Sequence, residues 1–173
     1  FSGAAPGISI SPIRVLGKCL TGRASDVADG LVWAAGGTID GLGTIPGGPV
    51  QAVVLALSGF GLCPSYLQSA VSLAVANNVT VFAAAGNDGA STSNYFPANC
   101  KGTVTVGASD AKGYRAPYSN VPHQIAYAGG THEKPSRTTL LFPFALNAPL
   151  KPPKRSVSNS FSSEEEINES SLP

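Results

Sequence analysis

Two short segments of this chain, Val50–Leu57 and Val79–Ala85, are almost entirely apolar. A strand without a polar face has to be covered on both sides, as strands are in a parallel sheet between layers of helices. Ile8–Leu16 and Thr103–Ala108 are predicted to be further strands of the same sheet. Crossovers between parallel strands of one sheet form right-handed βαβ units. The pattern therefore predicts an α/β fold with a central parallel sheet.

The segments between these strands have the residue spacing of helices. A helix over residues 26–33 is predicted to be capped by Asp26 and to stop at Gly36-Gly37. In the second segment, Ser65 and Gln68 match a capping box. Apolar residues then recur at helical spacing, at Leu67, Ala70, Val71, Ala74 and Val75. Both segments are predicted to be helices that cover the sheet.

The composition of the chain changes abruptly near Gly130. All 20 glycines lie at or before that residue, whereas six of the 14 prolines lie in residues 131–173. This last segment also carries a basic cluster at residues 151–155 and an acidic, serine-rich stretch at residues 162–166. Such a composition buries too little apolar surface to offset the entropy of the chain. We predict a largely disordered tail over 131–173, with Leu140–Leu150 as an apolar patch able to dock.

Several classes of partner are disfavoured by the sequence. The formal net charge is +1, so nothing in the charge favours nucleic acid or an anionic membrane. No stretch approaches the roughly 20 uninterrupted apolar residues of a membrane helix. No G-x-G-x-x-G or G-x-x-x-x-G-K-S/T loop follows a predicted strand, so a nucleotide-binding module is also disfavoured.

Three cysteines, Cys19, Cys63 and Cys100, are an odd number. In an oxidising compartment two of them would pair, and the third would have its partner outside this sequence. Three buried free thiols in a cytosolic protein are the alternative that counting alone leaves open.

Glycine-flanked loops follow three of the predicted strands, at Gly17–Gly22, Ser58–Gly61 and Gly86–Gly89. In open α/β sheets, ligands bind beyond the carboxyl ends of the strands, and glycine lets another backbone approach closely. The three loops can therefore line one cleft. Asn87 would offer two amide donors at the mouth of this cleft, although an Asn taken on its own is more often a turn former or a helix cap.

A series of segments follows these loops and strands in a fixed order. They are Arg14–Gly17, a helix from Ser25 to Ala35, Val53–Gly61, Phe82–Asn87, Tyr95–Ala98, Val104–Ala108 and Arg115–Ser119. In this order they resemble the landmarks of the subtilisin-like (S8) serine proteases, from about Gly3 to about Asn120 and more faintly to Gly130. The resemblance implies the three-layer α/β fold of that family, incomplete here, in a partial catalytic domain over residues 1–130.

The resemblance also implies roles for particular residues. Asn87 would be the oxyanion-hole side chain, which donates to the charge that develops on the carbonyl oxygen of the bond being cut. An extended polypeptide substrate would pair with two edges, formed by Leu20, Thr21 and Gly22 and by Ser58, Gly59 and Phe60. The pocket for the residue before the cut would be lined by Ala84, Ala85 and Gly86. Phe60 stands where the family usually has Gly, which leaves the substrate preference open.

Many secreted members of the family carry a disulfide where Cys63 and Cys100 stand, so the resemblance implies that these two pair and leave Cys19 over. It also implies an extracellular location. Family members often bind calcium, but the acidic residues here are too few and scattered to form a set of six to eight oxygen ligands. We therefore assign no metal site and no other cofactor.

The catalytic triad is the part of the family pattern that this sequence lacks. In the family, the Asp and the His lie upstream of the Arg14 strand, and the Ser lies downstream of Asn87 in a Gly-Thr-Ser-Met-Ala context. The chain contains no Gly-Thr-Ser and no Met, and His123 and His132 stand where the family has no base. We expect the chain alone to be inactive. It would be either the middle segment of an extracellular endopeptidase or a pseudoprotease that binds extended peptides without cutting them.

Overall fold

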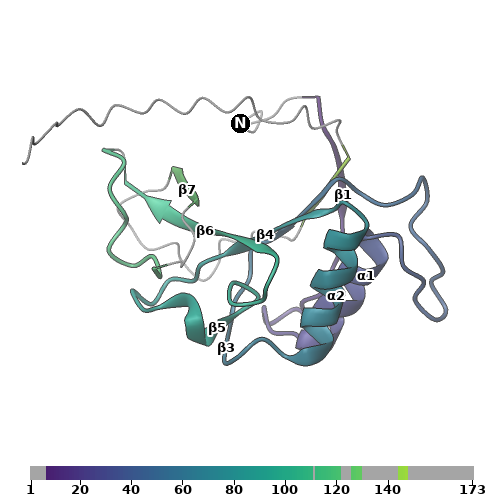
Figure 1. Ribbon diagram of the computed structural model, residues 1–173, viewed down its shortest axis with the longest axis horizontal. Coiled ribbons are helices and arrows are strands. Elements are labelled where there is room, and N and C mark those ends of the chain that lie inside the picture. The colour runs from purple at the N-terminus through teal and green to yellow at the C-terminus, as the bar shows by residue number, and fades with distance from the viewer. Residues whose placement is uncertain (1–6, 111, 122–125, 130–143, 148–173) are drawn as a thin grey trace, which may run out of the picture.

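The computed structural model describes residues 7–110, 112–121, 126–129 and 144–147. A six-stranded sheet with the order β1-β8-β2-β4-β6-β7 lies at the centre (Figure 1), and β3 and β5 form a separate two-stranded sheet. The strands of the main sheet are β1 (Ser9–Pro12), β2 (Ala52–Leu55), β4 (Thr80–Ala84), β6 (Thr103–Ser109), β7 (Ala126–Gly129) and β8 (Phe144–Asn147). The other elements are α1 (Ala24–Ala34), β3 (Gly59–Phe60), α2 (Ser65–Ala76), the 3-10 helix η1 (Thr92–Asn94) and β5 (Tyr95–Phe96).

The central strands β2, β4, β6 and β7 run parallel to one another. Val53 lies opposite Val81, and Ala83 lies opposite Thr105. The α/β fold with a parallel sheet is thereby confirmed. The observed β1 is shorter than the predicted Ile8–Leu16, since it ends at Pro12, which has no N–H to continue the ladder.

Both predicted helices are present, but their predicted caps are wrong. Arg23 occupies the N-cap of α1 without a side-chain hydrogen bond, and Asp26 lies inside the first turn, where a carboxylate complements the helix dipole. Pro64 occupies the N-cap of α2. Gln68 does not reach back to cap that helix. Its amide instead donates to the carbonyl of Lys101 (2.9 Å) and accepts from the N–H of Lys101 (2.8 Å).

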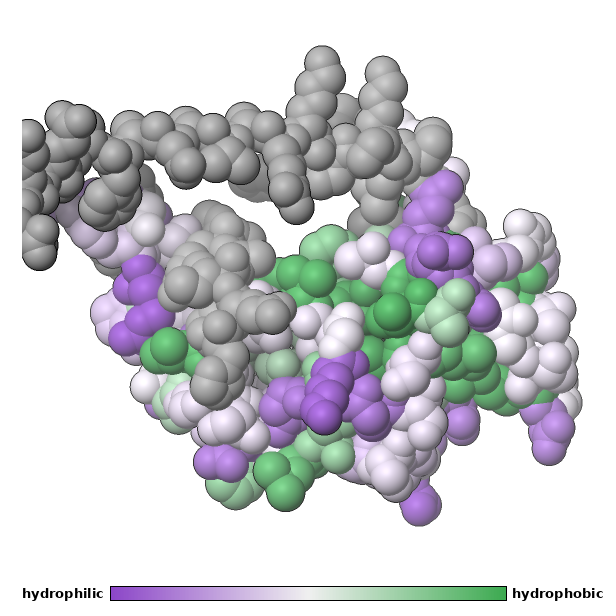
Figure 2. All heavy atoms as spheres, in the orientation of Figure 1, coloured by the Kyte–Doolittle hydropathy of each residue, from purple (hydrophilic) through white to green (hydrophobic). Residues whose placement is uncertain are grey.

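The two helices lie side by side and cover one face of the sheet (Figure 1). Leu31 of α1 and Leu67 of α2 are buried against Val53, Leu55 and Val81 of the strands. Gly36 ends α1 with a φ of +87°, a left-handed conformation in which glycine is favoured. The outer side of α2 still carries apolar side chains, and Figure 2 shows apolar surface over the helices.

The opposite face of the sheet is covered less completely. Val54, Phe82 and Val104 lie in one row across β2, β4 and β6. Val54 and Phe82 are only half-buried, and Val104 is 36% exposed. The prediction that both faces are covered is therefore met on one face only within the described residues, because both of the described α-helices belong to the other layer.

One strand of the sheet comes from the predicted tail over residues 131–173. β8 lies between β1 and β2 and runs antiparallel to both, with Ser9 opposite Asn147 and Val53 opposite Ala145. It falls within Leu140–Leu150, the apolar patch of the tail that was predicted to be able to dock. The rest of the predicted tail over 131–173 lies outside the described residues. Within the described part of the chain, no helix is long and apolar enough to cross a membrane.

Candidate functional site

Asn87 lies just beyond the carboxyl end of β4, the strand with β2 on one side and β6 on the other. Ala85 extends the pairing past the strand, because its N–H donates to the carbonyl of Val106 (2.9 Å). The chain then turns, and Asn87 is exposed while Gly86 before it is buried. The side-chain amide of Asn87 thus stands at the sheet edge where α/β proteins bind ligands.

The turn at Gly86 requires glycine for two reasons. Its φ of +98° lies in the left-handed region, and a Cβ there would overlap the Nδ2 of Asn120. The Oγ of Ser58 lies 3.6 Å from the position of that Cβ. The structure therefore brings two of the predicted site loops together, the one after β2 and the one after β4.

The side chain of Asn120 packs against the backbone of this turn. Asn120 was not predicted as a site residue. Its Nδ2 donates to the carbonyl of Ala85 (2.9 Å), and its Oδ1 accepts from the N–H groups of Asp88 and Ala90 (2.9 Å each). Asn120 is fully buried. The sequence offered one signal for it, the Ser119-Asn120 pair at the end of the last recognisable segment.

The second predicted edge is an edge of the small sheet. Gly59 and Phe60 form β3 and pair with Phe96 and Tyr95 of β5. Gly59 fits closely under its neighbour, because a Cβ at this position would overlap the ring of Phe96. In the described part of the chain, β5 is the single strand partner of β3. The other edge of β3 has no strand partner among the described residues.

Phe60 is unusually exposed for an aromatic residue on a strand. Its side chain is 78% exposed, and its ring meets that of Tyr95 edge to face, with 5.6 Å between the ring centroids. Partial burial, followed by the charge of Asp88 and a hydrogen bond to it, raises the pKa of Tyr95. Tyr95 thus contacts both the exposed ring of Phe60 on β3 and Asp88, the residue that follows Asn87.

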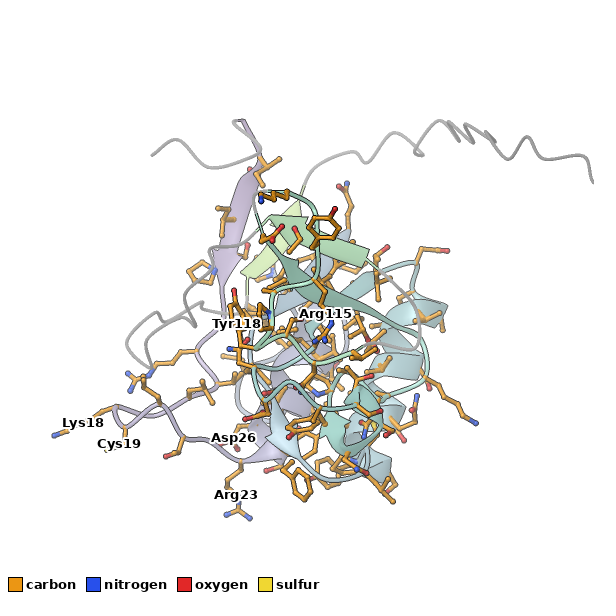
Figure 3. All side chains as sticks on the ribbon, turned by 90° about the vertical axis from the view of Figure 1, so that its left-hand side faces the viewer. Lys18, Cys19, Arg23, Asp26, Arg115 and Tyr118 are labelled. Atoms are coloured by element: carbon orange, nitrogen blue, oxygen red, sulfur yellow. A yellow bond between two sulfur atoms is a disulfide. The ribbon has the colours of Figure 1, made fainter. Side chains whose placement is uncertain are left out.

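The first predicted edge, Leu20–Gly22, forms an exposed turn. The N–H of Gly17 donates to the carbonyl of Thr21 (2.9 Å), and the N–H of Leu20 donates to the carbonyl of Gly17 (3.1 Å). Leu20 has a φ of 61°. Lys18, Cys19 and Arg23 point outward at the same corner of the molecule (Figure 3). Within the described residues, no hydrogen bond joins this turn to the Ser58–Phe60 segment.

The three predicted pocket residues are small and lie at the end of β4. Ala84 is the last residue of the strand and is half-buried, whereas Ala85 and Gly86 are buried. Because residues alternate along a strand, Ala84 lies on the same face as Phe82. Of the three, Ala84 therefore lies on the face that α1 and α2 do not cover.

A disulfide joins Cys63, before α2, to Cys100, before β6, with 5.2 Å between their Cα atoms. Cys19 is exposed and is the free cysteine among the described residues. His123 and His132 lie outside the described residues. In the part of the chain that the structure describes, no group of three or more His, Cys, Asp or Glu residues is placed to hold a metal ion.

Comparisons with known proteins bear on this geometry. The model of the family described as "Subtilase family" matches residues 1–162. An "Extracellular protease" of Xanthomonas campestris is 42% identical over 119 residues, which are 69% of this chain and 20% of that protein. An "Extracellular basic protease" of Dichelobacter nodosus is 40% identical over 127 residues, which are 73% of this chain and 21% of that protein.

A solved structure is also similar, that of a protease from Pseudoalteromonas arctica. It superposes with a TM-score of 0.67 at 40% sequence identity, over 71% of this chain and 36% of that one. A cold-adapted subtilisin-like serine proteinase gives a TM-score of 0.51 at 30% identity, over 62% of this chain and 35% of that one. This chain thus spans about a fifth of the length of the two extracellular proteases.

Proposed function

Because this chain belongs to the subtilase family of serine proteases, we propose that it is the part of a secreted endopeptidase that builds the oxyanion site and the substrate groove. In this proposal, residues 1–130 are a partial catalytic domain, and residues 131–173 are a divergent tail. The three residues of the catalytic triad (Asp, His and Ser) are not part of this chain, so the chain alone cuts no peptide bond.

One observation carries the proposal, the position of Asn87. Its amide is exposed directly beyond the carboxyl end of a central parallel strand, on a turn whose backbone is bonded on both sides. Acyl transfer creates negative charge on the carbonyl oxygen, and a preorganised donor stabilises that charge. Loss of such a donor costs about 10²–10³-fold in kcat, a magnitude known from subtilisin itself.

The groove of the proposal follows from the free edge of β3. Extended peptides bind sheet edges through main-chain hydrogen bonds, and Ser58, Gly59 and Phe60 supply such an edge beside the turn at Gly86. Leu20, Thr21 and Gly22 are proposed as the opposite edge. Ala84, Ala85 and Gly86 are proposed to line the pocket, where their small size leaves room for a substrate side chain.

Secretion is proposed on two grounds. The Cys63–Cys100 disulfide is of a kind that persists in oxidising compartments and is rare in the cytosol. The two extracellular proteases described above are related to this chain over about seven-tenths of its length.

The test uses a peptide in which a phosphonate replaces the amide to be cut, compared with the same peptide carrying the amide. The phosphonate is a stable tetrahedral group with a negative oxygen, so it reports on an oxyanion donor without a nucleophile. Calorimetric titration is expected to show about tenfold or tighter binding of the phosphonate peptide, the magnitude of a hydrogen bond to a charged group. Asn87→Ala is expected to abolish this preference.

The matched control is Asn94→Ala, which removes another exposed Asn, on η1. It is expected to keep the preference. Equal affinity of the wild-type chain for the two peptides would exclude the oxyanion role, and tight binding of both would favour the pseudoprotease alternative. Hydrolysis of the amide peptide by the purified chain would refute the proposed inactivity.

A further inference from the structure

We propose that Asn120 is a positioning residue that fixes the direction of Asn87, an inference that rests on the proposed function. Asn120 is completely buried and lies in a different loop from the residues that it binds. A buried amide is costly unless its donors and acceptor are bonded. All three side-chain bonds go to the backbone of the turn around Asn87, at Ala85, Asp88 and Ala90.

These bonds enclose Asn87 without touching its side chain. The Nδ2 of Asn120 holds the residue two positions before Asn87, and the Oδ1 holds the residues one and three positions after it. The Asn87 side chain stays exposed. The arrangement fixes the backbone of the turn and leaves one side chain available, which is the condition for a preorganised donor.

Backbone pairing adds to the side-chain bonds. The N–H of Asn120 donates to the carbonyl of Gly86 (3.0 Å), and the N–H of Val121 donates to that of Ala90 (2.8 Å). From the other side, the N–H of Gly89 donates to the carbonyl of Tyr118 (2.8 Å). The turn after β4 and the segment 118–121 are therefore bonded along their length.

The Asn120 segment is in turn fixed to the sheet. The Oγ of Ser119 accepts from the N–H of Ala108 on β6 (3.0 Å), and the N–H of Ala116 donates to the carbonyl of Ala108 (2.9 Å). Since β6 pairs with β4, the turn is held from its own strand and from the neighbouring strand. The backbone that carries Asn87 is thus held in place by both β4 and β6.

Asparagine is the side chain that this position requires. The turn needs a donor for the carbonyl of Ala85 and an acceptor for the N–H groups of Asp88 and Ala90, and the Asn side-chain amide supplies both. Aspartate keeps the acceptor but places an oxygen against the carbonyl of Ala85. Alanine leaves the carbonyl and both N–H groups without their partner.

The test compares Asn120→Ala and Asn120→Asp with the wild-type chain, using the phosphonate and amide peptides. Asn120→Ala is expected to lower the phosphonate preference by about tenfold, to the level of Asn87→Ala, while the affinity for the amide peptide stays within about twofold. Asn120→Asp is expected to lose less. Hydrogen exchange at the N–H groups of Asp88 and Ala90 is expected to quicken in Asn120→Ala.

Asn77→Ala is the control, because it removes another Asn side-chain bond to a distant backbone group, a part-buried bond from Nδ2 to the carbonyl of Ala35 (2.7 Å) at the C-cap of α2. It is expected to lower the melting temperature and to keep the phosphonate preference. A preference retained in both Asn120 variants, but lost in Asn87→Ala, would overturn the role of Asn120 alone. A wild-type chain without any preference would overturn the proposed function first and this inference with it.

Discussion

The two sides of this molecule are held together by different forces. The helix side, where α1 and α2 cover the sheet, is apolar, and Val53, Leu55 and Val81 are each 3% exposed or less. The site side, made of β3, β5, the turn over 85–90 and the segment 118–121, is held mainly by hydrogen bonds to backbone groups. Two polar side chains of the segment 118–121, Ser119 and Asn120, are buried on this side.

This difference separates stability from site geometry. Apolar burial is non-directional and scales with the area removed from water, so the helix side sets the free energy of unfolding. Hydrogen bonds depend on distance and angle, so the site side sets where Asn87 points. Changes on the helix side are therefore expected to alter unfolding, and changes on the site side to alter ligand preference.

The largest expected effect is the loss of the disulfide on the helix side. Cys63 and Cys100 are 37 residues apart, and closing a loop of that length contributes about 3–4 kcal/mol. The double variant Cys63→Ser/Cys100→Ser is expected to lose about that much free energy of unfolding in urea. Cys19→Ser, at an exposed free thiol, is the control and is expected to change nothing. Loss of the phosphonate preference in the folded double variant would contradict the separation of the two sides.

The next effect compares two consecutive valines of β2. Val53 lies under the helices and is 3% exposed, whereas Val54 faces the other side and is half-buried. Val53→Ala is expected to cost about 2 kcal/mol of unfolding free energy, and Val54→Ala less than about 1 kcal/mol. Urea unfolding measures both. Equal costs would mean that the two faces are covered to the same extent.

A smaller effect is expected at Phe60 on the site side. Its ring is 78% exposed, so Phe60→Ala is expected to change the unfolding free energy by less than about 1 kcal/mol. The same change is expected to weaken binding of the amide peptide by about 3- to 10-fold, since an aromatic contact contributes about 0.5–1.5 kcal/mol. Leu62→Ala, 77% exposed on the same segment, is the control for general loss of apolar surface. Equal weakening in both variants would remove any special role for the aromatic ring.

The smallest effect is a pH dependence from Tyr95. Burial raises the pKa of Tyr95 above its ordinary value of 10.0, and Asp88 raises it further. The folded state therefore holds the phenol proton more tightly, so the stabilisation is complete below pH 10 and is lost as the pH rises through the folded pKa. Ultraviolet titration of Asp88→Asn is expected to show this pKa lowered but still above 10, because burial remains. Tyr95→Phe identifies the signal, and an unchanged titration in Asp88→Asn would exclude the contact with Asp88.

Much of the fold could be predicted from local patterns in the sequence. The apolar runs identified β2 and β4, because a buried parallel strand needs an apolar side chain at nearly every position. The predicted caps at Asp26 and Gln68 were wrong. Such a match gives the spacing of a cap but not the competing partner, which for Gln68 is the backbone of Lys101. Strand β8 also escaped prediction as a strand, because its pairing depends on residues near the other end of the chain.

The site was predictable in part. The glycine loops marked the strand ends, and the structure brings Ser58 next to Gly86. Asn120 has no local pattern, because its partners at Ala85, Asp88 and Ala90 are 30 to 35 residues away in sequence. Buried polar contacts of this kind depend on how loops meet in space. The assignment of Leu20–Gly22 as the opposite edge stays a prediction.

The place of β8 in the sheet has a consequence for the order in which the chain can fold. Strand β1 is synthesised before every other described element, yet its ladder partner β8 is the last of them, with Ile10 opposite Leu146. Contacts between distant parts of a chain form slowly, since a long loop must close first. During synthesis, β1 therefore stays without its β8 partner while α1, β2 and α2 form, and the β1–β8 ladder is completed only after residues 144–147 have been made.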